Sequence, residues 1–474
     1  MNEITLFEKQ RKIYPRSVKG IYRRLKWLSM IVLLGIYYIV PWLRWDRGSH
    51  APDQAVLVDM ASRRLYFFNI ELWPQEVYFL AGLLILAAVG LFFVTSLLGR
   101  VWCGYACPQT VWTDLFVAVE NFIQGDRNER MKLDKSGWSF EKIRKKTLTH
   151  ILWLLIALCT GGAWVFYFVD APTLLDQIRH LDVSRMVGSW IFGLTASTYI
   201  MAGYAREQVC TYMCPYARFQ SAMFDKDTLI IGYDRERGEP RGKHKQGTSW
   251  ENKGHCIDCM QCVVVCPMGI DIRNGLQMEC IACGLCVDAC NDVMDKMQLP
   301  KGLIRYDTQH NYELRTLAKE AQMPFKPEVR FLRPRSFYYI TIISLLSAVM
   351  LFAFFNRSTI ELSVIHDRNP LYVKLSDGSI RNTYMIKVIN KTHDDHIFSL
   401  AVDGLDVKNI TVVGAGDLDS DHLHVLADSV TPFRLMLTAD IQSEDRKEIL
   451  FTVHDDAGFL SDASETVFMS EVRR

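Results

Sequence analysis

The sequence lacks an excess of either charge. Its 54 lysines and arginines are balanced by 53 aspartates and glutamates, so the 474 residues carry a formal net charge of +1. A protein that binds nucleic acid needs a surplus of positive side chains to neutralise phosphates. The charge balance therefore argues against a nucleic-acid partner.

Two further absences limit the chemistry of the chain. Residues 357–474 contain none of the 13 cysteines, so this segment must fold on apolar packing alone. The long apolar stretches hold no pair of histidines placed to bind a haem iron from both sides. Cysteine chemistry is therefore confined to residues 1–356, and a bis-histidine haem is not expected.

Five stretches are apolar over nearly the ~20 residues that a helix needs to cross a bilayer. The first continues into Pro41–Trp45, an interfacial aromatic anchor, and has no small-residue cleavage site. We interpret it as an uncleaved helix and not as a signal peptide. The fourth is the most polar, because it contains two serines and two threonines. The predicted spans are Trp27–Leu43, Val77–Leu98, Ile151–Val169, Met186–Ala205 and Phe337–Phe355.

The distribution of lysine and arginine predicts the orientation of these spans. Residues 1–26 contain eight of them, and the loop after the second span is also basic, whereas the loop after the third is not. Positive loops stay in the cytoplasm. Alternation then places residues 206–336 in the cytoplasm, where thiols remain reduced, and residues 357–474 outside.

Two cysteine runs lie in the predicted cytoplasmic segment. Each has the spacing C-x2-C-x2-C-x3-C, which wraps the chain around a 4Fe–4S cluster and gives the fourth cysteine to a neighbouring cluster. A four-cysteine zinc site would leave the third cysteine and the x3 spacing unexplained. We therefore predict a bacterial two-cluster ferredoxin-like module. One cluster is assigned to Cys256, Cys259, Cys262 and Cys290, and the other to Cys280, Cys283, Cys286 and Cys266.

A shorter cysteine motif, C-x-Y-x-C-P, occurs twice, at Cys103–Pro108 after the second span and at Cys210–Pro215 after the fourth. Proline disfavours helix at the preceding cysteine and is well placed to begin a new helix. We therefore predict two sharp turns, related by an internal repeat. The first is expected to lead into an amphipathic surface helix at Val111–Phe122, which contains Asp114 and Glu120.

The four cysteines of these turns admit two interpretations. Cys103, Cys107, Cys210 and Cys214 could form a soft-metal or redox site that faces the iron–sulfur module. Alternatively, they are small buried residues at helix ends, as Cys159 is expected to be within the third span. The repetition of a pair in matched context favours the site. Nearby aromatic residues are interpreted as an interfacial belt and not as an electron relay, namely Trp102, Trp112, Tyr105 and Tyr216.

The C-terminal segment alternates apolar and polar residues with a period of two. About seven short strands separated by turn signals predict an immunoglobulin-like sandwich. Six of the 12 histidines lie here, and His422 and His424 would share one face of a strand. They could bind copper, but exposed polar residues are the more common case.

These predictions divide the chain into five parts of a multidomain membrane protein. They are a basic cytoplasmic tail (1–26), a four-helix transmembrane domain with two C-x3-C-P turns (27–235), a cytoplasmic ferredoxin-like domain with two clusters (236–330), a fifth transmembrane helix (331–356) and an all-β immunoglobulin-like domain (357–474).

Several segments resemble the CcoG/FixG/RdxA proteins, which are cytochrome c oxidase accessory proteins of bacterial inner membranes. They are Val101–Asp114, Cys256–Arg273, Glu279–Cys290 and Asp295–Tyr306. The resemblance covers nearly the whole chain and implies that the outer domain is periplasmic. It also implies reduction of Cu(II) to Cu(I), with copper as substrate, for assembly of a cbb3-type oxidase. The paired cysteines of the family match Cys103, Cys107, Cys210 and Cys214, and its ferredoxin cysteines match the eight assigned above.

The resemblance also implies partners, which are copper chaperones or oxidase subunits, and a homo-oligomer is compatible with it. Two other functions are open from the sequence. One is quinol-linked electron transfer, as in related membrane ferredoxins of nitrate and nitrous oxide respiration, although the large outer sandwich argues against it. The other is a non-catalytic assembly scaffold in which the clusters are only structural.

Overall fold

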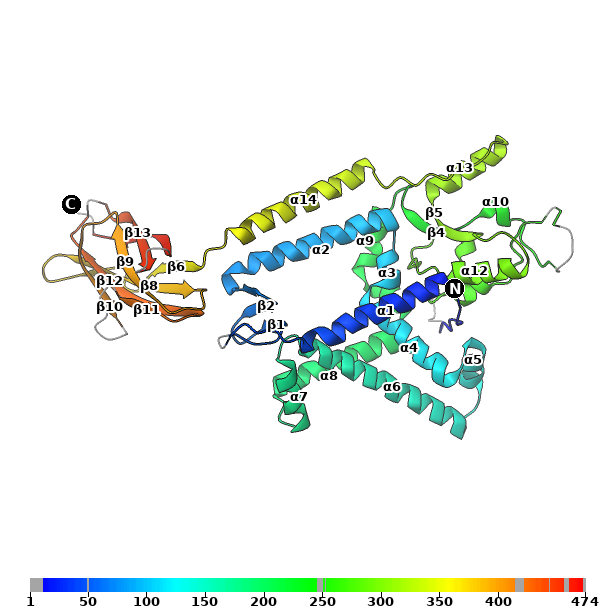
Figure 1. Cartoon of the computed structure of the whole chain (residues 1–474), viewed down its shortest axis with the longest axis horizontal. Helices are drawn as coiled ribbons and strands as arrows, with labels where there is room; N and C mark the ends of the chain where they lie inside the picture. Colours follow the sequence, from blue (N-terminus) through cyan, green and yellow to red (C-terminus); the bar gives the residue numbers. More distant parts are fainter. Residues whose placement is uncertain are drawn as a thin grey trace, which may run out of the picture. The chain divides into compact units, whose positions relative to one another are not determined.

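The computed structural model describes residues 12–48, 51–244, 250–251, 253–413, 422–442, 444–455 and 460–471 (Figure 1). Contacts divide the chain into two compact units. One lies within Met1–Trp45 and Asp53–Met350, and the other within Asp46–Pro52 and Leu351–Arg474. Of the predicted basic tail, residues 1–26, residues 1–11 lie outside the described residues.

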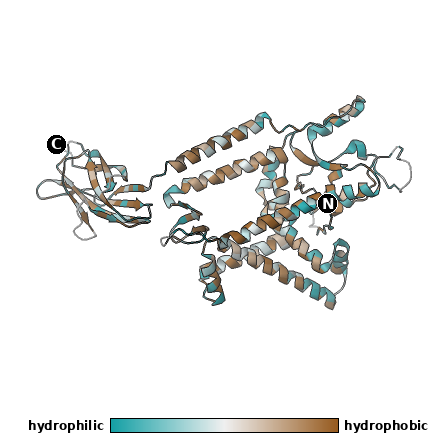
Figure 2. Cartoon of the chain, in the orientation of Figure 1, coloured by the Kyte–Doolittle hydropathy of each residue, from teal (hydrophilic) through white to brown (hydrophobic). Residues whose placement is uncertain are grey.

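Four helical segments of the described chain are long and apolar enough to cross a membrane: Ile21–Trp42, Pro74–Leu98, Phe140–Val165 and Pro334–Phe355. They contain α1 (Ile21–Ile39), α2 (Val77–Leu98), α6 (Phe140–Val165) and α14 (Pro334–Phe355). Hydrophobic residues dominate α2 and α14 along their length (Figure 2). The four segments indicate a membrane protein.

The predicted span at Met186–Ala205 is not among these four segments. The α-helix there, α8 (Arg185–Ile200), has 16 residues and continues into a π-helical turn, η3 (Met201–Ala205). At 1.5 Å per residue, α8 alone covers about 24 Å, which is less than the thickness of a bilayer core. The count of five spanning helices therefore remains a prediction.

Small residues let the helices of the membrane unit approach closely. A Cβ atom on Gly161 in α6 would lie 2.8 Å from Oγ1 of Thr195 in α8. The helix α4 (Pro108–Gln124) also packs on α6, where the rings of Phe116 and Trp153 stack with centroids 5.2 Å apart. This packing fixes α4, which leads out of the first cysteine turn.

The carboxylates of α4 do not face solvent. An amphipathic surface helix would require them to do so. Glu120 is 4% exposed and accepts hydrogen bonds from Arg206 Nη2 at 2.8 Å and from Arg130 Nη1 at 2.9 Å. Burial alone would raise the pKa of Glu120, but the two arginines outweigh it and lower the pKa. The prediction of an exposed polar face is wrong because these charges are paired inside the protein.

Several short elements gave no signal in the sequence. A three-stranded sheet, β1 (Val56–Asp59), β2 (Arg64–Phe67) and β3 (Ile70–Leu72), joins α1 to α2. Two nine-residue helices, α5 (Arg127–Lys135) and α7 (Ala171–Arg179), flank α6. Segments of three to nine residues are too short to establish a hydrophobic period.

The ferredoxin-like module is built on a two-stranded antiparallel sheet. Strand β4 (Leu229–Tyr233) pairs with β5 (Ile304–Thr308), so the sheet includes residues before position 236, where the module was expected to begin. The segment after β4 starts with the short helix α10 (Arg235–Gly238). The other helices are α11 (Gln261–Val264), η5 (Ile272–Asn274), α12 (Leu285–Lys296) and α13 (Gln309–Glu320).

A carboxylate of the module caps the first membrane helix. Asp288 in α12 accepts hydrogen bonds from the backbone N–H groups of Tyr22 and Arg23, at 3.3 and 2.8 Å. These donors belong to the first turn of α1, whose own N-cap, Gly20, offers no side chain. The chain before α1 also binds the module, because Arg16 N donates to Val264 O at 3.0 Å.

The C-terminal unit is a sandwich of two antiparallel sheets. The nine strands that the structure describes exceed the seven expected. One sheet contains β6 (Ile360–His366), β7 (Val373–Lys374), β8 (Ile380–Asn390), β10 (Val407–Val413) and β12 (Ser429–Ala439). The other contains β9 (His396–Asp403), β11 (Leu423–Val425), β13 (Arg446–Asp455) and β14 (Ser461–Met469). The core of the sandwich packs around fully buried rings such as Tyr384, Phe398 and Phe451.

We predict that Glu120→Gln destabilises the membrane unit strongly, because it leaves Arg130 and Arg206 buried without a counter-charge. The expected loss is roughly 3–5 kcal/mol, measured by thermal unfolding in detergent. Since the folded pKa of Glu120 is lowered, the contribution is complete above its ordinary pKa of 4.5 and is lost as the pH falls below that value. The control is Glu313→Gln, an exposed partner of Lys226, which should unfold at the wild-type temperature. An unfolding temperature of the Glu120→Gln variant equal to that of the wild type would contradict the prediction.

Candidate redox site

Four of the eight ferredoxin cysteines line one small cavity. Cys256, Cys259 and Cys262 come from a single loop, and Cys290 comes from α12. The loop curls because Asp258 and Met260 take left-handed backbone conformations, with φ of 54° and 58°. Arg273 holds this curl through an ion pair with Asp258 at 2.5 Å. The structure thus brings together the same four thiols that the sequence assigns to one cluster.

The other four cysteines form a second group. The charges of Cys283 and Cys266 contribute to raising the pKa of Cys280. The charges of all three other cysteines of the group contribute to raising the pKa of Cys286. The loop curls in the same way, with positive φ at Ala282 and Gly284. Burial raises the pKa of Cys266 to about 11 and that of Cys280 to about 12. Iron would therefore displace protons from these thiols when it binds.

Both groups fit an iron–sulfur cluster by the chemistry of their donors. Each offers four thiols in apolar surroundings, which is the ligand set of a 4Fe–4S cluster. Among the described residues, no three His, Cys, Asp or Glu side chains are close enough to hold a single metal ion.

The two C-x3-C-P turns have the predicted form. The short helix α3 (Val101–Tyr105) ends before Cys107, which is the N-cap residue of α4, and Pro108 is the first residue of that helix. The second turn, η4 (Val209–Met213), is π-helical, and Cys214 and Pro215 begin α9 (Pro215–Met223) in the same way. The repeat is therefore preserved at the second cysteine and differs before it.

The structure brings the four cysteines of these turns, here called the cysteine quartet, close to one another. The pKa of Cys210 is raised to about 12 by burial and then by the charges of Cys107, Cys103 and Cys214. The pKa of Cys103 is also raised, again mainly by burial. No three thiols of the quartet are close enough to share one ion in this arrangement, whereas two thiolates are sufficient for Cu(I).

The first turn packs directly on the loop of the second cysteine group. A Cβ atom on Gly104 would lie 2.7 Å from Ile281 O and 3.0 Å from Cys283 Cα, so only glycine allows this approach. The hydroxyl of Tyr105 donates to Cys283 O at 3.0 Å. Cys103, Cys283 and Cys286 belong to one apolar cluster with Tyr216. Tyr105 therefore contacts the ferredoxin-like module, and its assignment to an interfacial belt is wrong. Tyr216 packs against a cluster that includes residues of the module.

Two polar residues that the sequence analysis missed connect the quartet to the module. Gln220 in α9 is 1% exposed, and its Nε2 donates to Cys103 Sγ at 3.3 Å. Its Oε1 accepts from Arg100 Nε, and Arg100 Nη1 donates to Met278 O and Cys280 O. Arg100 directly follows an apolar stretch, where a cation is usually interfacial. That position concealed its role.

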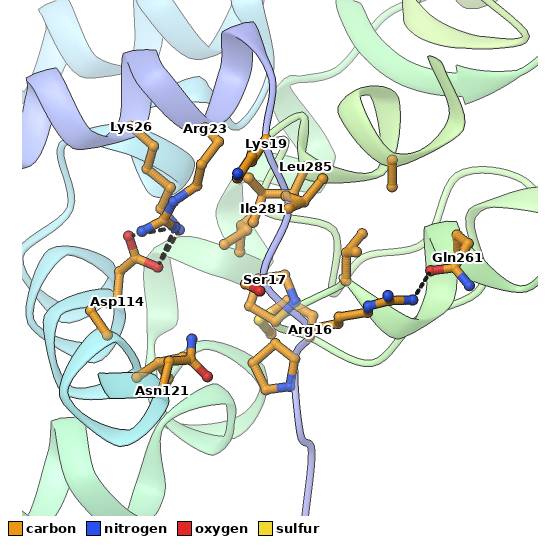
Figure 3. A pocket seen from close by; sticks show the side chains of 18 of the residues that line it. Arg16, Ser17, Lys19, Arg23, Lys26, Asp114, Asn121, Gln261, Ile281 and Leu285 are labelled. Carbon is orange, nitrogen blue, oxygen red and sulfur yellow. Dashed lines mark hydrogen bonds and ion pairs between the residues drawn. The ribbon is translucent and has the colours of Figure 1, made fainter. Parts of the chain in front are cut away.

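A cavity of about 1010 Å³ is lined by the N-terminal segment, α1 and α4 on one side and by the module on the other. Cys210 of the quartet and Cys259 of the first cysteine group both line it. In Figure 3, Arg23 and Lys26 of α1 point toward Asp114, to which Arg23 Nη1 donates at 2.9 Å. Arg16 crosses the cavity and donates to Gln261 Oε1 at 2.9 Å. The cavity therefore lies against both predicted redox centres.

The remaining candidates stand apart from these groups. Cys159 is exposed on α6. In the sandwich, His422 and His424 are both exposed, and the described residues offer no set of three metal ligands there.

Three families match parts of the chain. Residues 205–309 match the family described as "4Fe-4S dicluster domain", and residues 80–123 match "4Fe-4S binding domain". Residues 350–471 match the immunoglobulin-like fold at the C-terminus of FixG. The matches indicate an iron–sulfur protein with an immunoglobulin-like C-terminal domain.

Curated relatives are similar over most of the chain. The nitrogen fixation protein FixG of Rhizobium meliloti is 49% identical and aligns over 91% of this chain and 87% of its own length. Protein RdxA of Cereibacter sphaeroides is 46% identical and aligns over 96% of this chain and 95% of its own length. A crystal structure of a FixG-related protein from Vibrio parahaemolyticus is 26% identical, covers 24% of this chain and 100% of its own, and has a TM-score of 0.21. At these identities and coverages, the chain belongs to the FixG/RdxA family of membrane iron–sulfur proteins.

Proposed function

We propose that the chain reduces Cu(II) to Cu(I) for assembly of a cbb3-type cytochrome c oxidase. The observation that supports this most is the direct packing of the Cys103 turn on the loop of Cys283. An electron acceptor site built from soft thiols thereby adjoins the cysteines of an iron–sulfur module.

The proposal assigns two 4Fe–4S clusters, one to each cysteine group. Cys256, Cys259, Cys262 and Cys290 would hold the first, and Cys266, Cys280, Cys283 and Cys286 the second. Such clusters supply one-electron transfer at low potential. Cys256, Cys262 and Cys283 are buried, so these three ligands would be shielded from water.

The order of the centres follows from their neighbours. The first cysteine group faces the large cavity through Cys259, which is exposed, and the second group adjoins the quartet through Cys103. Cys286 of the second group packs against the apolar cluster that contains Cys256 and Cys262 of the first. Electrons would therefore enter at the first group and leave from the second toward the quartet.

The quartet would then accept copper as substrate. Each Cu(II) takes one electron and becomes Cu(I), which thiolates bind in preference to Cu(II). Cys210 keeps its proton at neutral pH because its pKa is about 12, so binding of Cu(I) to this sulfur releases a proton. The turns hold the four sulfurs at the ends of α3, η4 and the helices that follow them.

The proposal also includes sidedness and partners. The N-terminus and the iron–sulfur module would lie in the cytoplasm of a bacterial inner membrane, and the sandwich in the periplasm. Copper chaperones or oxidase subunits would be the partners of the sandwich. The basic first turns of α1, with Arg23, Arg24 and Lys26, support this orientation.

One alternative is favoured by a specific observation. The large cavity touches α1, a predicted span, and adjoins both Cys259 and Cys210, so it could admit the headgroup of a membrane quinol. A purified protein that oxidises quinol and leaves Cu(II) unreduced would replace the copper proposal with quinol-linked electron transfer.

We predict two clusters per chain, and therefore about eight iron and about eight sulfide per chain after anaerobic purification. Cys290→Ser should remove one cluster and leave the other, halving both values. The control is Cys159→Ser, which should retain all iron because this exposed thiol lies outside both groups. Zinc in place of iron, or about four iron in the wild type, would disprove the assignment.

We predict that the quartet acts after the clusters. The double substitution Cys107→Ser and Cys214→Ser should leave the visible absorption of the clusters intact and abolish Cu(II) reduction, because serine is a poor ligand for a soft metal. The assay is anaerobic titration of the reduced protein with Cu(II), again with Cys159→Ser as control. A double variant that reduces Cu(II) at the wild-type rate would show that the quartet is structural.

We predict that the sandwich serves a partner and carries no electrons. It has no cysteine and packs around its own core, so deletion of residues 358–474 should preserve cluster content and Cu(II) reduction in detergent. Oxidase assembly in cells should be impaired. Loss of Cu(II) reduction by a truncated protein that retains both clusters would refute this division of labour.

A further inference from the structure

Arg100 differs from every other buried arginine of the described chain. The buried arginines are Arg100, Arg130, Arg206, Arg273 and Arg333. Four of them have carboxylate partners: Glu120 for Arg130 and Arg206, Asp258 and Asp271 for Arg273, and Asp225 for Arg333. Arg100 is 5% exposed and forms no ion pair with any described residue.

All hydrogen-bond partners of Arg100 are neutral. They are the side-chain oxygen of Gln220 and the backbone oxygens of Met278 and Cys280. These contacts satisfy N–H groups but do not neutralise the charge. A buried charge is strongly unfavourable unless an opposite charge lies nearby. The compensating negative charge must therefore come from a group other than a carboxylate.

Two of the neutral partners of Arg100 belong to or contact cysteine residues. Arg100 touches the backbone of Cys280, a predicted ligand of the second cluster, and reaches Cys103 of the quartet through Gln220. The positive charge of Arg100 favours the thiolate forms of Cys103, Cys210 and Cys280 and so opposes the rise in their pKa values. The geometry points to Arg100 as a positioning residue: a fixed counter-charge shared by the second 4Fe–4S cluster and the copper-bearing quartet.

The charge favours the more negative state of each centre. Adding an electron to the second cluster makes it more negative, so a nearby cation shifts its reduction equilibrium toward the reduced form. At the quartet, a pair of thiolates with Cu(I) carries one more negative charge than the same pair with Cu(II). Arg100 therefore favours arrival of the electron at the second cluster and retention of the product. The copper half of this inference rests on the proposed function, and the cluster half does not.

Gln220 offers a test that separates charge from packing. Its Oε1 accepts from Arg100, so Gln220→Glu places a carboxylate of almost the same shape beside the guanidinium. The hydrogen bonds of Arg100 remain and its charge becomes paired, whereas the hydrogen bond from Gln220 Nε2 to Cys103 Sγ is lost. Arg100→Gln removes the charge, and Arg100→Lys retains it with a different shape.

The experiment is an anaerobic redox titration of the full-length protein, followed by the electron paramagnetic resonance of each reduced cluster. The Cys290→Ser variant identifies the signal of the second cluster. Arg100→Gln and Gln220→Glu should each shift its reduction equilibrium about tenfold toward the oxidised form, which is about 59 mV for one electron. Arg100→Lys should remain near the wild type, and the first cluster should not shift in any variant.

Two outcomes would overturn the inference. Either Arg100→Lys matches Arg100→Gln, which would mean that shape and not charge matters, or Gln220→Glu leaves the second cluster unshifted. If Arg100→Gln fails to assemble iron, the reduction equilibria of Arg100→Lys and Gln220→Glu test the inference.

A second measurement addresses copper separately. Competition with a chromogenic Cu(I) chelator should show about tenfold weaker Cu(I) binding by Gln220→Glu. An altered cluster potential with unchanged Cu(I) binding would confine the role of Arg100 to the cluster. A wild-type protein that does not bind Cu(I) would refute the proposed function and leave the potential shift standing.

Discussion

The close approach of one backbone turn to another is the constraint on which the rest of the redox site depends. Gly104 lies so near Ile281 O and Cys283 Cα that a side chain at this position would collide with the iron–sulfur loop. Because Cys103 precedes Gly104, this contact sets the separation between the quartet and the second cysteine group. The hydrogen bond from Tyr105 to Cys283 O holds the same contact from the other side.

That contact is maintained by a module that is tied to the membrane helices at several points. Asp288 caps α1, and the backbone of Arg16 binds α11. On the opposite side, the shared carboxylate of Glu120 fixes α4 to Arg130 and Arg206. Since α4 begins at Pro108, any movement of these anchors would also move Cys107. Electron transfer depends on distance, so anchors remote from the cysteines contribute to function through rigidity.

The sequence predicted the parts of this site whose chemistry resides in spacing. The C-x2-C-x2-C-x3-C runs predicted which four thiols meet, and the prolines predicted where α4 and α9 begin. It did not predict what the turns contact. Tyr105 and Tyr216 were assigned to the membrane interface because aromatic residues at the ends of apolar stretches usually lie there, and Arg100 was not singled out at all. Their partners are loops more than 60 residues away in the chain, and no local pattern encodes such a pairing.

The same limit explains the error in α4 and the irregular geometry after α8. The apolar pattern of α4 correctly indicated a helix, but its polar residues Asp114 and Glu120 are paired inside the protein, with Arg23 of α1 and with Arg206, which follows η3. Hydropathy records the cost of burying a carboxylate and not the partner that offsets it. In α8, the chain leaves α-helical geometry at Met201 and passes through a π-helical turn before Arg206. That turn brings Arg206 back onto Glu120 and positions Cys210 beside Cys103, so the segment that departs most from a regular spanning helix is the one that completes the quartet.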